Sequence, residues 1–516
     1  MFKNLNYLYT IILLLISFIV NFYYGSIGVF PIDTFAFFDS ANAINNGFLP
    51  IRDYWTSNGF LVDLLQSIFF KIFGVSWHVY LLHSALLNFI LSFFTYKFLT
   101  NEGLSLTLSL FYSISVGILA YPSVGVPFSD HHSLIFSIMS IYSFIFSFQK
   151  NSKLFLFLTI LFLAMAFLCK QIPAAFFIIL VGFYLLYFLI KKNNYKLILN
   201  SLIFTFSLLL IFLLFLIITN VGIKNFFIQY INFPLSIGSE RAESLKAGNF
   251  IISLLKEFKF FVLLSLIIFY QIIKEKKNNN TEKSRVLSTG VIFIIVTFIS
   301  IVNQELMKNQ NILFFILPIL IGIIHSKIKI EKKKKIFSFF SLLIFFNIFI
   351  TLKYHERFNV DRKFIELEKI SKKNITKGSK ISNNLKGLKW ISSLEQNEFP
   401  NEIILLKESI GYLRNNKNNS MIITYYQFIN SEIRHFIYPP NRWYTNDGVS
   451  YPLKENKFFN YYVVFFKNQL IKNKINKIYT IYPLEKNSFS FALNENCIKT
   501  KKINKILSEH LLINCF

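Results

Sequence analysis

Long apolar runs constrain the fold of this chain more than any other feature. A run of roughly 17–22 apolar residues is long enough to cross a bilayer as a helix, because the hydrocarbon core is about 30 Å thick. Such runs recur at residues 6–24, 77–98, 103–121, 131–148, 154–169, 173–190, 197–218, 255–273, 286–302, 310–325 and 336–352. The sequence therefore predicts a polytopic α-helical membrane protein with about eleven transmembrane helices.

The charge of the chain supports a membrane topology. A formal net charge of +27 in a soluble protein would suggest nucleic-acid binding, but the chain is 54% hydrophobic and its lysines gather in short loops between apolar runs. The lysine-rich loops are 149–153, 191–196, 274–285 and 326–335. The positive-inside rule assigns them to the cytoplasm together with the N-terminus, so we expect membrane lipids around the chain and no nucleic-acid partner.

Eleven spans are an odd number, so a chain whose N-terminus is cytoplasmic continues on the outer side after the last span. The sequence therefore predicts two domains, residues 1–352 in the membrane and residues 353–516 outside it. Helical spacing at 400–414 and 458–473 and short β-type runs at 421–426 and 477–483 predict a small extracytoplasmic α/β domain, although 458–473 could begin as a buried strand. Cys497 and Cys515 lie in this tail. An oxidising compartment favours a disulfide between them, and two free thiols are the alternative.

The first outer loop, residues 25–76, gathers carboxylates beside the membrane in a chain that has only 27 acidic residues. Apolar spacing at 34–48 and at 60–72 predicts two helices lying in the membrane interface, joined by a turn region. Asp33 precedes the first of these helices, where a carboxylate serves either as a general base or as a helix cap. Asp39 falls on the polar side of that helix, and Asp53 in the turn region.

Two more polar clusters fall at the outer ends of apolar runs. The stretch "SDHH" places Asp130 and His131 at the start of the run 131–148, where they suit a divalent metal ion or a phosphate contact, or simply a helix cap. The stretch "CKQ" places Lys170 and Gln171 on the side that disfavours basic residues. Lys170 is therefore a candidate partner for a phosphate or carboxylate, with an anchoring lysine as the alternative.

Two further outer loops carry charged residues. The loop 219–254 contains Arg241 between two glutamates, and the loop 303–309 contains Lys308. Both loops suit closure over a site at the outer interface, and both equally suit solvated connections.

The first outer loop resembles that of the GT-C membrane glycosyltransferases, particularly the glycosyltransferase family 39 type. "DSANAINNGFLPIRDYW" matches the A-x-x-x-x-x-G-x-x-P-x-x-D element, and "LLQSIFFKIFG" follows it to Gly74. "SDHH", "CKQ" and the Leu-Pro run "NILFFILPIL" resemble later features of that family. The resemblance spans roughly residues 1–352 and includes protein O-mannosyltransferases and aminoarabinose transferases.

The resemblance implies inverting transfer of a sugar from a polyprenyl-phosphate donor to a lipid, glycan or protein acceptor outside a bacterial-type cytoplasmic membrane. It implies Asp33 as the catalytic carboxylate. Thr34 stands where the family often has Glu, so either Asp39 supplies the second carboxylate or there is none. The remaining implied roles are Asp130 as an acceptor or metal contact with His131, a donor-phosphate site at Lys170, Gln171 and Arg52, and substrate-loop contacts at Asp53, Arg241 and Lys308.

A transporter or flippase for a lipid-linked glycan is the main alternative. Secondary transporters hold polar groups near the bilayer midplane in broken helices. Here the runs 154–169 and 173–190 are almost free of charge, and the polar clusters lie at the outer ends. A tail that only binds, on a membrane scaffold, is a third alternative, which the first-loop carboxylates disfavour.

Overall fold

The computed structural model of the chain describes residues 2–26, 34–120, 125–192, 195–243, 247–276, 283–307, 312–327, 375–390, 402–416, 419–433, 435–444 and 448–515. The predicted span 336–352, Asp33 and Lys308 lie outside these residues.

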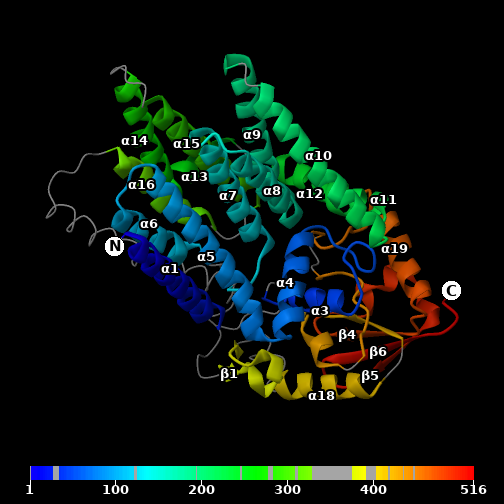
Figure 1. The fold of residues 1–516 in the computed structure, drawn as a ribbon. Helices are drawn as coiled ribbons and strands as arrows, with labels where there is room; N and C mark the ends of the chain where they lie inside the picture. The colour runs from blue at the N-terminus through cyan, green and yellow to red at the C-terminus, as the bar shows by residue number, and fades with distance from the viewer. Residues whose placement is uncertain are drawn as a thin grey trace.

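Apolar helices occupy the other ten predicted runs (Figure 1). They are α1 (Phe2–Gly25), α5 (Trp77–Asn101), α6 (Leu106–Leu119), α7 (Ser129–Gln149), α8 (Lys153–Cys169), α9 (Gln171–Lys192), α10 (Tyr195–Ile218), α14 (Lys259–Lys276), α15 (Lys283–Met307) and α16 (Ile316–Ser326), the last preceded by a 3-10 turn at Ile312–Phe315. Within the described residues, five helices are long and apolar enough to cross a bilayer. The chain is therefore a membrane protein, and the count of eleven spans stays a prediction.

The apolar helices α7 and α10 differ in how much of their surface is buried against other helices. In α7, 94% of the most apolar window is buried against neighbouring helices, chiefly α8 and α9, whereas in α10 only 11% is buried. Apolar side chains such as Phe206 and Ile218 are exposed along α10. This exposure is expected where lipid tails rather than water surround a helix.

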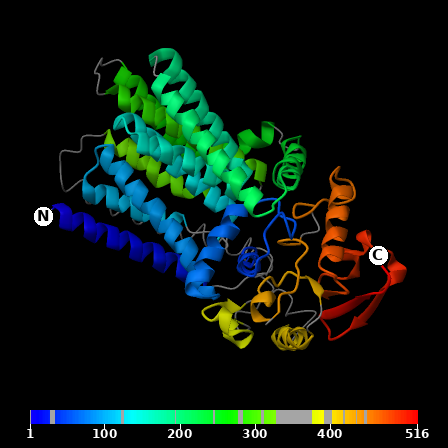
Figure 2. The ribbon, with the colours of Figure 1, turned by 45° about the vertical axis from the view of Figure 1, so that its right-hand side comes forward.

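The first outer loop folds into two short helices between the membrane helices and the C-terminal domain (Figures 1 and 2). These are α3 (Phe38–Asn45) and α4 (Phe60–Phe73). The expected amphipathic helix at 34–48 is thus shorter, and its polar side is not solvated as an interfacial helix would require. Asp39 and Asn42 are both buried, because residues near Asn430 of the C-terminal domain cover that side.

The described residues of the predicted loop 219–254 are mostly helical. It contains α11 (Ile223–Phe226), a π-helical turn (Phe227–Asn232), α12 (Phe233–Glu243) and α13 (Ala247–Lys256). Tyr461 of the C-terminal domain donates a hydrogen bond to Asn225, and Asn456 donates one to Ser236 over 3.0 Å. This segment therefore packs against the C-terminal domain.

The C-terminal domain has the predicted α/β character. Helices α18 (Glu402–Asn415) and α19 (Phe459–Lys472) accompany a sheet of order β3-β4-β6-β5, in which β3 and β4 are parallel and the other pairs antiparallel. The strands are β3 (Ser420–Ile423), β4 (Lys477–Ile481), β5 (Ile498–Lys502) and β6 (Leu507–Leu512), and a separate pair joins β1 (Thr376–Lys377) to β2 (Lys389–Trp390).

Short 3-10 turns complete this domain at Gly378–Lys380, Asn383–Leu385, Ile429–Glu432, Lys486–Ser488, Ser490–Ala492 and Glu495–Cys497. The predicted helices and the strands β3 and β4 are confirmed. Strands β5 and β6 form a hairpin that the sequence analysis did not predict. A disulfide joins Cys497 to Cys515, as the compartment argument favoured.

The first outer loop and the C-terminal domain share backbone hydrogen bonds. Trp55 N–H donates to Pro440 O over 2.9 Å, and Arg442 N–H donates to Trp55 O over 3.1 Å. The Trp55 ring is fully buried and packs edge-on against Tyr462 and Phe465 of α19. Because main-chain pairing and a buried indole both fix this junction, the two segments form one packed unit.

Candidate functional site

A polar hollow lies where the first outer loop meets the C-terminal domain. It has about 330 Å³ of empty space, its open mouth included, and its walls lie so close that the enclosed part holds little more than ordered water. Its lining comes from two distant parts of the sequence: Asp39, Ser40 and Tyr54 on one side, and Ile422, Thr424, Gln427, Asn430, Pro439, Asn441, Arg442 and Tyr444 on the other.

Asp39 is the carboxylate of this hollow. It lies in the first turn of α3 and is only 6% exposed. Its Oδ2 accepts a hydrogen bond from the Asn430 backbone N–H over 3.3 Å. Burial raises the Asp39 pKa to about 8, against the lowering effect of backbone hydrogen bonds. A carboxyl group that titrates near neutral pH is suited to accept or donate a proton in catalysis.

Several buried polar atoms around the hollow have no hydrogen-bond partner among the described residues. They are Asp39 Oδ1, Gln427 Oε1, Asn441 Nδ2, Arg442 Nε and Tyr444 OH. An unpaired buried polar group costs about 1–3 kcal/mol, so such atoms are normally satisfied by water or by a ligand. Five of them around one hollow indicate a site that receives a polar molecule.

Arg442, which lines the hollow, belongs to a buried ion pair. Arg442 Nη1 lies 3.3 Å from Asp63 Oδ2, and the two side chains are 2% and 0% exposed. Ser40, the neighbour of Asp39, also donates to the Asp63 carboxylate. Burial raises the Asp63 pKa to about 6 while Arg442 opposes this rise. The Arg442 guanidinium lies over the ring of Phe37, with 4.6 Å to the ring centroid.

Gly59 connects this ion pair to the junction between α8 and α9. It has φ of +72° just before α4, and a Cβ there would collide with Arg442 and with the Phe37 ring. Its N–H donates to Cys169 O over 2.7 Å. The predicted basic residue Lys170 follows Cys169 directly, although it does not line the hollow.

Lys170 and Asp130, predicted separately, form an ion pair. Lys170 Nζ lies 2.6 Å from Asp130 Oδ1, and their side chains are 12% and 5% exposed. Asp130 lies in the first turn of α7, whose N-cap residue is Phe128, so Asp130 does not cap this helix. The Asp130 carboxylate compensates the Lys170 charge, so a phosphate oxygen binds Lys170 only by sharing or replacing this contact.

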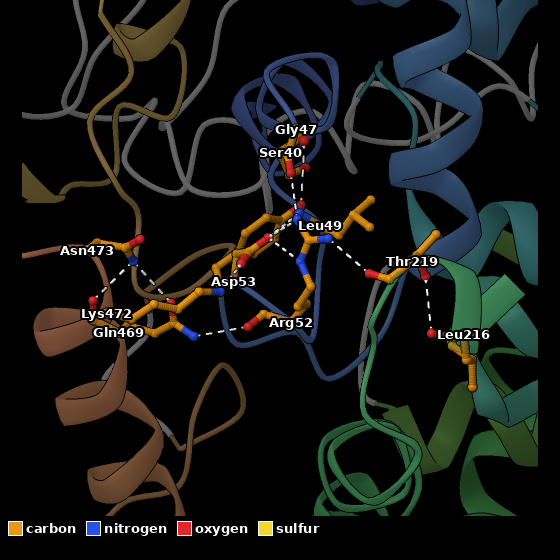
Figure 3. A network of polar contacts seen from close by, with 11 residues as sticks. Ser40, Gly47, Leu49, Arg52, Asp53, Leu216, Thr219, Gln469, Lys472 and Asn473 are labelled. Carbon is orange, nitrogen blue, oxygen red and sulfur yellow. Dashed lines mark hydrogen bonds and ion pairs between the residues drawn. The ribbon is translucent and has the colours of Figure 1, made fainter.

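Arg52 and Asp53 belong to a structural network rather than to the hollow (Figure 3). Arg52 pairs with Asp53 over 2.7 Å and donates to Gly47 O and Thr219 O. Asp53 also accepts from Lys472 of α19 over 3.0 Å. These contacts tie the turn region to α10 and to the C-terminal domain, and they occupy the groups that donor-phosphate or substrate binding would need.

The other predicted residues have local partners. Gln171 donates to Ser57 O over 2.9 Å and also to Tyr230 O, which fixes the α8–α9 junction against the first loop. Arg241 contacts the Met307 sulfur over 3.9 Å. Neither side chain lines the hollow. Asp33 and Lys308 lie outside the described residues, so their roles stay predictions.

The structure does not assemble the metal site expected at Asp130 and His131. Within the described residues no three His, Cys, Asp or Glu side chains come together in a metal-binding group. Asp130 is engaged by Lys170, and His131 Nε2 contacts the Ala120 carbonyl.

Sequence reasoning identified Asp39 but missed the other half of the site. Gln427, Asn441 and Arg442 follow a strand that the sequence did predict, and nothing in their spacing indicates a partner nearly 400 positions earlier. One local signal was available: Asp63 interrupts the apolar run of α4. A carboxylate there requires either water or a buried cation, and Arg442 is that cation.

Comparison with known proteins adds no assignment. No protein-family model matches this chain, and no curated protein matches its sequence.

Proposed function

We propose that this membrane protein is an inverting glycosyltransferase, which moves a sugar from a polyprenyl-phosphate donor to a lipid, glycan or protein acceptor. The observation that carries the proposal is Asp39, a buried carboxylate with a pKa of about 8 and one unpartnered oxygen in a polar hollow. The hollow admits a hydroxyl group rather than a whole sugar. In its ionised form, which is the minor form below about pH 8, Asp39 is suited to orient and deprotonate an acceptor hydroxyl presented at the mouth.

The Lys170–Asp130 pair supports the donor half of the proposal. Departure of the donor phosphate places negative charge on its oxygens, and a fixed ammonium group stabilises that charge in the transition state. Lys170 is largely buried and follows Cys169, which accepts a hydrogen bond from Gly59 beside Arg442. Cys169 and Gly59 therefore link the Lys170 segment to Arg442, which lines the hollow.

The reaction side is proposed to be the outer side of a bacterial-type cytoplasmic membrane. By the predicted topology, the lysine-rich loops connect the helix ends on the other side of the membrane from the first outer loop. The positive-inside rule favours a cytoplasmic location for those loops. The disulfide in the C-terminal domain supports an oxidising compartment for the hollow.

The test compares cells that lack the protein with cells complemented by the wild type or by Asp39→Asn. Mass spectrometry of envelope lipids, glycans and glycoproteins should reveal one sugar that disappears on deletion and returns with the wild type. Asp39→Asn keeps the shape of the side chain and removes the base, so we expect at least about a 100-fold loss of transfer.

Asn45→Ala, on the exposed turn of the same helix, is the matched control and should restore the sugar fully. Equal membrane amounts of all variants must be shown by immunoblot. An unchanged envelope composition after deletion, or full transfer by Asp39→Asn, would contradict the proposal.

A further inference from the structure

The residues that line the hollow offer both donors and acceptors that lack a partner among the described residues. Asn441 Oδ1 accepts from Tyr462 over 2.9 Å, which leaves the amide nitrogen of Asn441 as a free donor. The Tyr444 hydroxyl is a second free donor, because burial raises the Tyr444 pKa and the hydroxyl keeps its hydrogen. Gln427 Oε1 is a free acceptor, and so is Asp39 Oδ1 in the ionised form.

Arg442 contributes the fifth free group, and its side chain is held in place. Its Nη1 pairs with Asp63 over 3.3 Å, and its Nη2 donates to Asn58 over 2.7 Å. The guanidinium also packs against the rings of Phe37 and Trp443, 4.6 and 4.2 Å from their centroids. These contacts leave the Nε–H of Arg442 as a donor with a fixed position.

This mixture of donors and acceptors does not suit a ligand group that only accepts or only donates. A phosphate or carboxylate anion has no hydrogen for Gln427, and an ammonium group has no lone pair for Asn441. A hydroxyl group does both, but one hydroxyl makes at most three hydrogen bonds, one as donor and two as acceptor. The five free groups therefore need more than one hydroxyl, and two neighbouring hydroxyls offer two hydrogens and four lone pairs.

We propose that the hollow recognises two adjacent hydroxyls of a sugar ring, so that the acceptor of the transfer is a sugar residue rather than a serine or threonine side chain. Adjacent hydroxyls project from one edge of a sugar ring, so they fit a narrow hollow while the ring stays at its mouth. A serine or threonine side chain brings only one hydroxyl. The inference rests on the proposed function and narrows its acceptor.

The two hydroxyls have different roles in the transfer. Ionised Asp39 takes the proton of one of them as its oxygen bonds to the anomeric carbon of the donor sugar, and the polyprenyl phosphate leaves with the electrons of the broken carbon–oxygen bond. The neighbouring hydroxyl does not react and binds to Asn441, Arg442 and Tyr444. These three residues therefore select an acceptor whose reacting hydroxyl has a free neighbour.

The first experiment identifies the group to which the sugar is attached. The envelope fraction that loses a sugar on deletion is compared with the wild-type fraction by permethylation linkage analysis, and by β-elimination, which releases sugars from serine and threonine. The wild type should carry the sugar on a ring position whose adjacent hydroxyl is free. Attachment to serine or threonine, or to a position without a neighbouring hydroxyl, would overturn this inference and leave the proposed function standing. If deletion removes no sugar, both fail.

Tyr444→Phe tests the recognition itself, because it removes a free hydroxyl and no hydrogen bond between described residues. An unpaired buried hydroxyl destabilises a fold, so the variant should melt at the same temperature as the wild type or higher. The rate at which the envelope sugar returns after induction should nevertheless fall about 2- to 10-fold, which is the effect of losing one neutral hydrogen bond.

Tyr479→Phe is the matched control in the same domain. Tyr479 is fully buried, its hydroxyl donates to Glu509 over 3.1 Å, and it does not line the hollow. This variant should melt at a lower temperature and transfer the sugar at the wild-type rate. If Tyr444→Phe transfers as fast as the wild type, or loses stability as Tyr479→Phe does, the Tyr444 hydroxyl serves the fold rather than an acceptor and the inference is overturned.

Discussion

The backbone N–H of Asn430 donates to the Asp39 carboxylate although 391 positions separate the two residues. In the return direction, Asp39 N–H donates to Gln427 O over 3.0 Å. The burial that raises the Asp39 pKa therefore depends on the C-terminal domain being in place. This domain is part of the candidate site rather than an attached module, which argues against a tail that only binds.

The raised pKa of Asp39 predicts a pH-dependent stability. Between about pH 4 and pH 8 the folded protein keeps a proton on Asp39 that the unfolded chain has lost, so this residue lowers stability as pH rises. Asp39→Asn removes this dependence. The melting temperature of the variant minus that of the wild type should therefore be larger at pH 8 than at pH 5. Equal differences at both pH values would contradict a buried, protonated Asp39.

Asp33 is the second first-loop carboxylate to test. The family resemblance implies that it acts on the acceptor, so Asp33→Asn should abolish sugar transfer while the protein still inserts into the membrane. The measurement is the envelope sugar described above, together with the amount of protein in the membrane fraction. Full activity in Asp33→Asn would leave Asp39 as the sole first-loop base.

The sequence predicted the membrane helices, which depend on local patterns, but not the contacts between residues far apart in the chain. Apolar length gave ten helices, because backbone hydrogen bonds must be satisfied within each helix in lipid. The burial of Asp39 was not predictable, because the periodicity of α3 shows a polar side without showing what covers it. The pairing of Lys170 with Asp130 likewise depends on how α7 and α8 pack, which neither helix encodes alone.

The Arg442–Asp63 pair predicts a large, pH-dependent loss on mutation. Arg442→Met leaves Asp63 charged and buried, which should lower the free energy of unfolding by about 3–5 kcal/mol at pH 8. At pH 5 the loss should be smaller, because Asp63, whose pKa is already raised to about 6, accepts a proton. Adding Asp63→Asn should recover part of the loss at pH 8. Denaturation in detergent followed by tryptophan fluorescence measures all three variants, and a loss independent of pH would exclude a buried charge as its cause.

The disulfide predicts a reductant-sensitive C-terminal domain. It closes a segment with a sequence separation of 18, for which the loss of chain entropy in the unfolded state gives about 3 kcal/mol. Cys515→Ser should lower stability by this amount. A maleimide of high mass should label the denatured wild type only at Cys169 unless reductant is added first, and Cys169→Ala should then remain unlabelled. Labelling of Cys497 without reductant would show free thiols.

Membrane orientation is tested by reporter fusions on either side of the last predicted span. Lysines gather in the loop 326–335, so this loop should stay in the cytoplasm and the chain after residue 352 should be outside. Alkaline phosphatase, which requires an oxidising compartment, should be active when fused after residue 352 and inactive when fused after residue 330. A fluorescent protein that matures only in the cytoplasm should give the opposite pair of signals. Activity of the phosphatase at residue 330 but not at 352 would place the hollow at Asp39 on the cytoplasmic side, where a lipid-linked sugar donor facing outward cannot reach it.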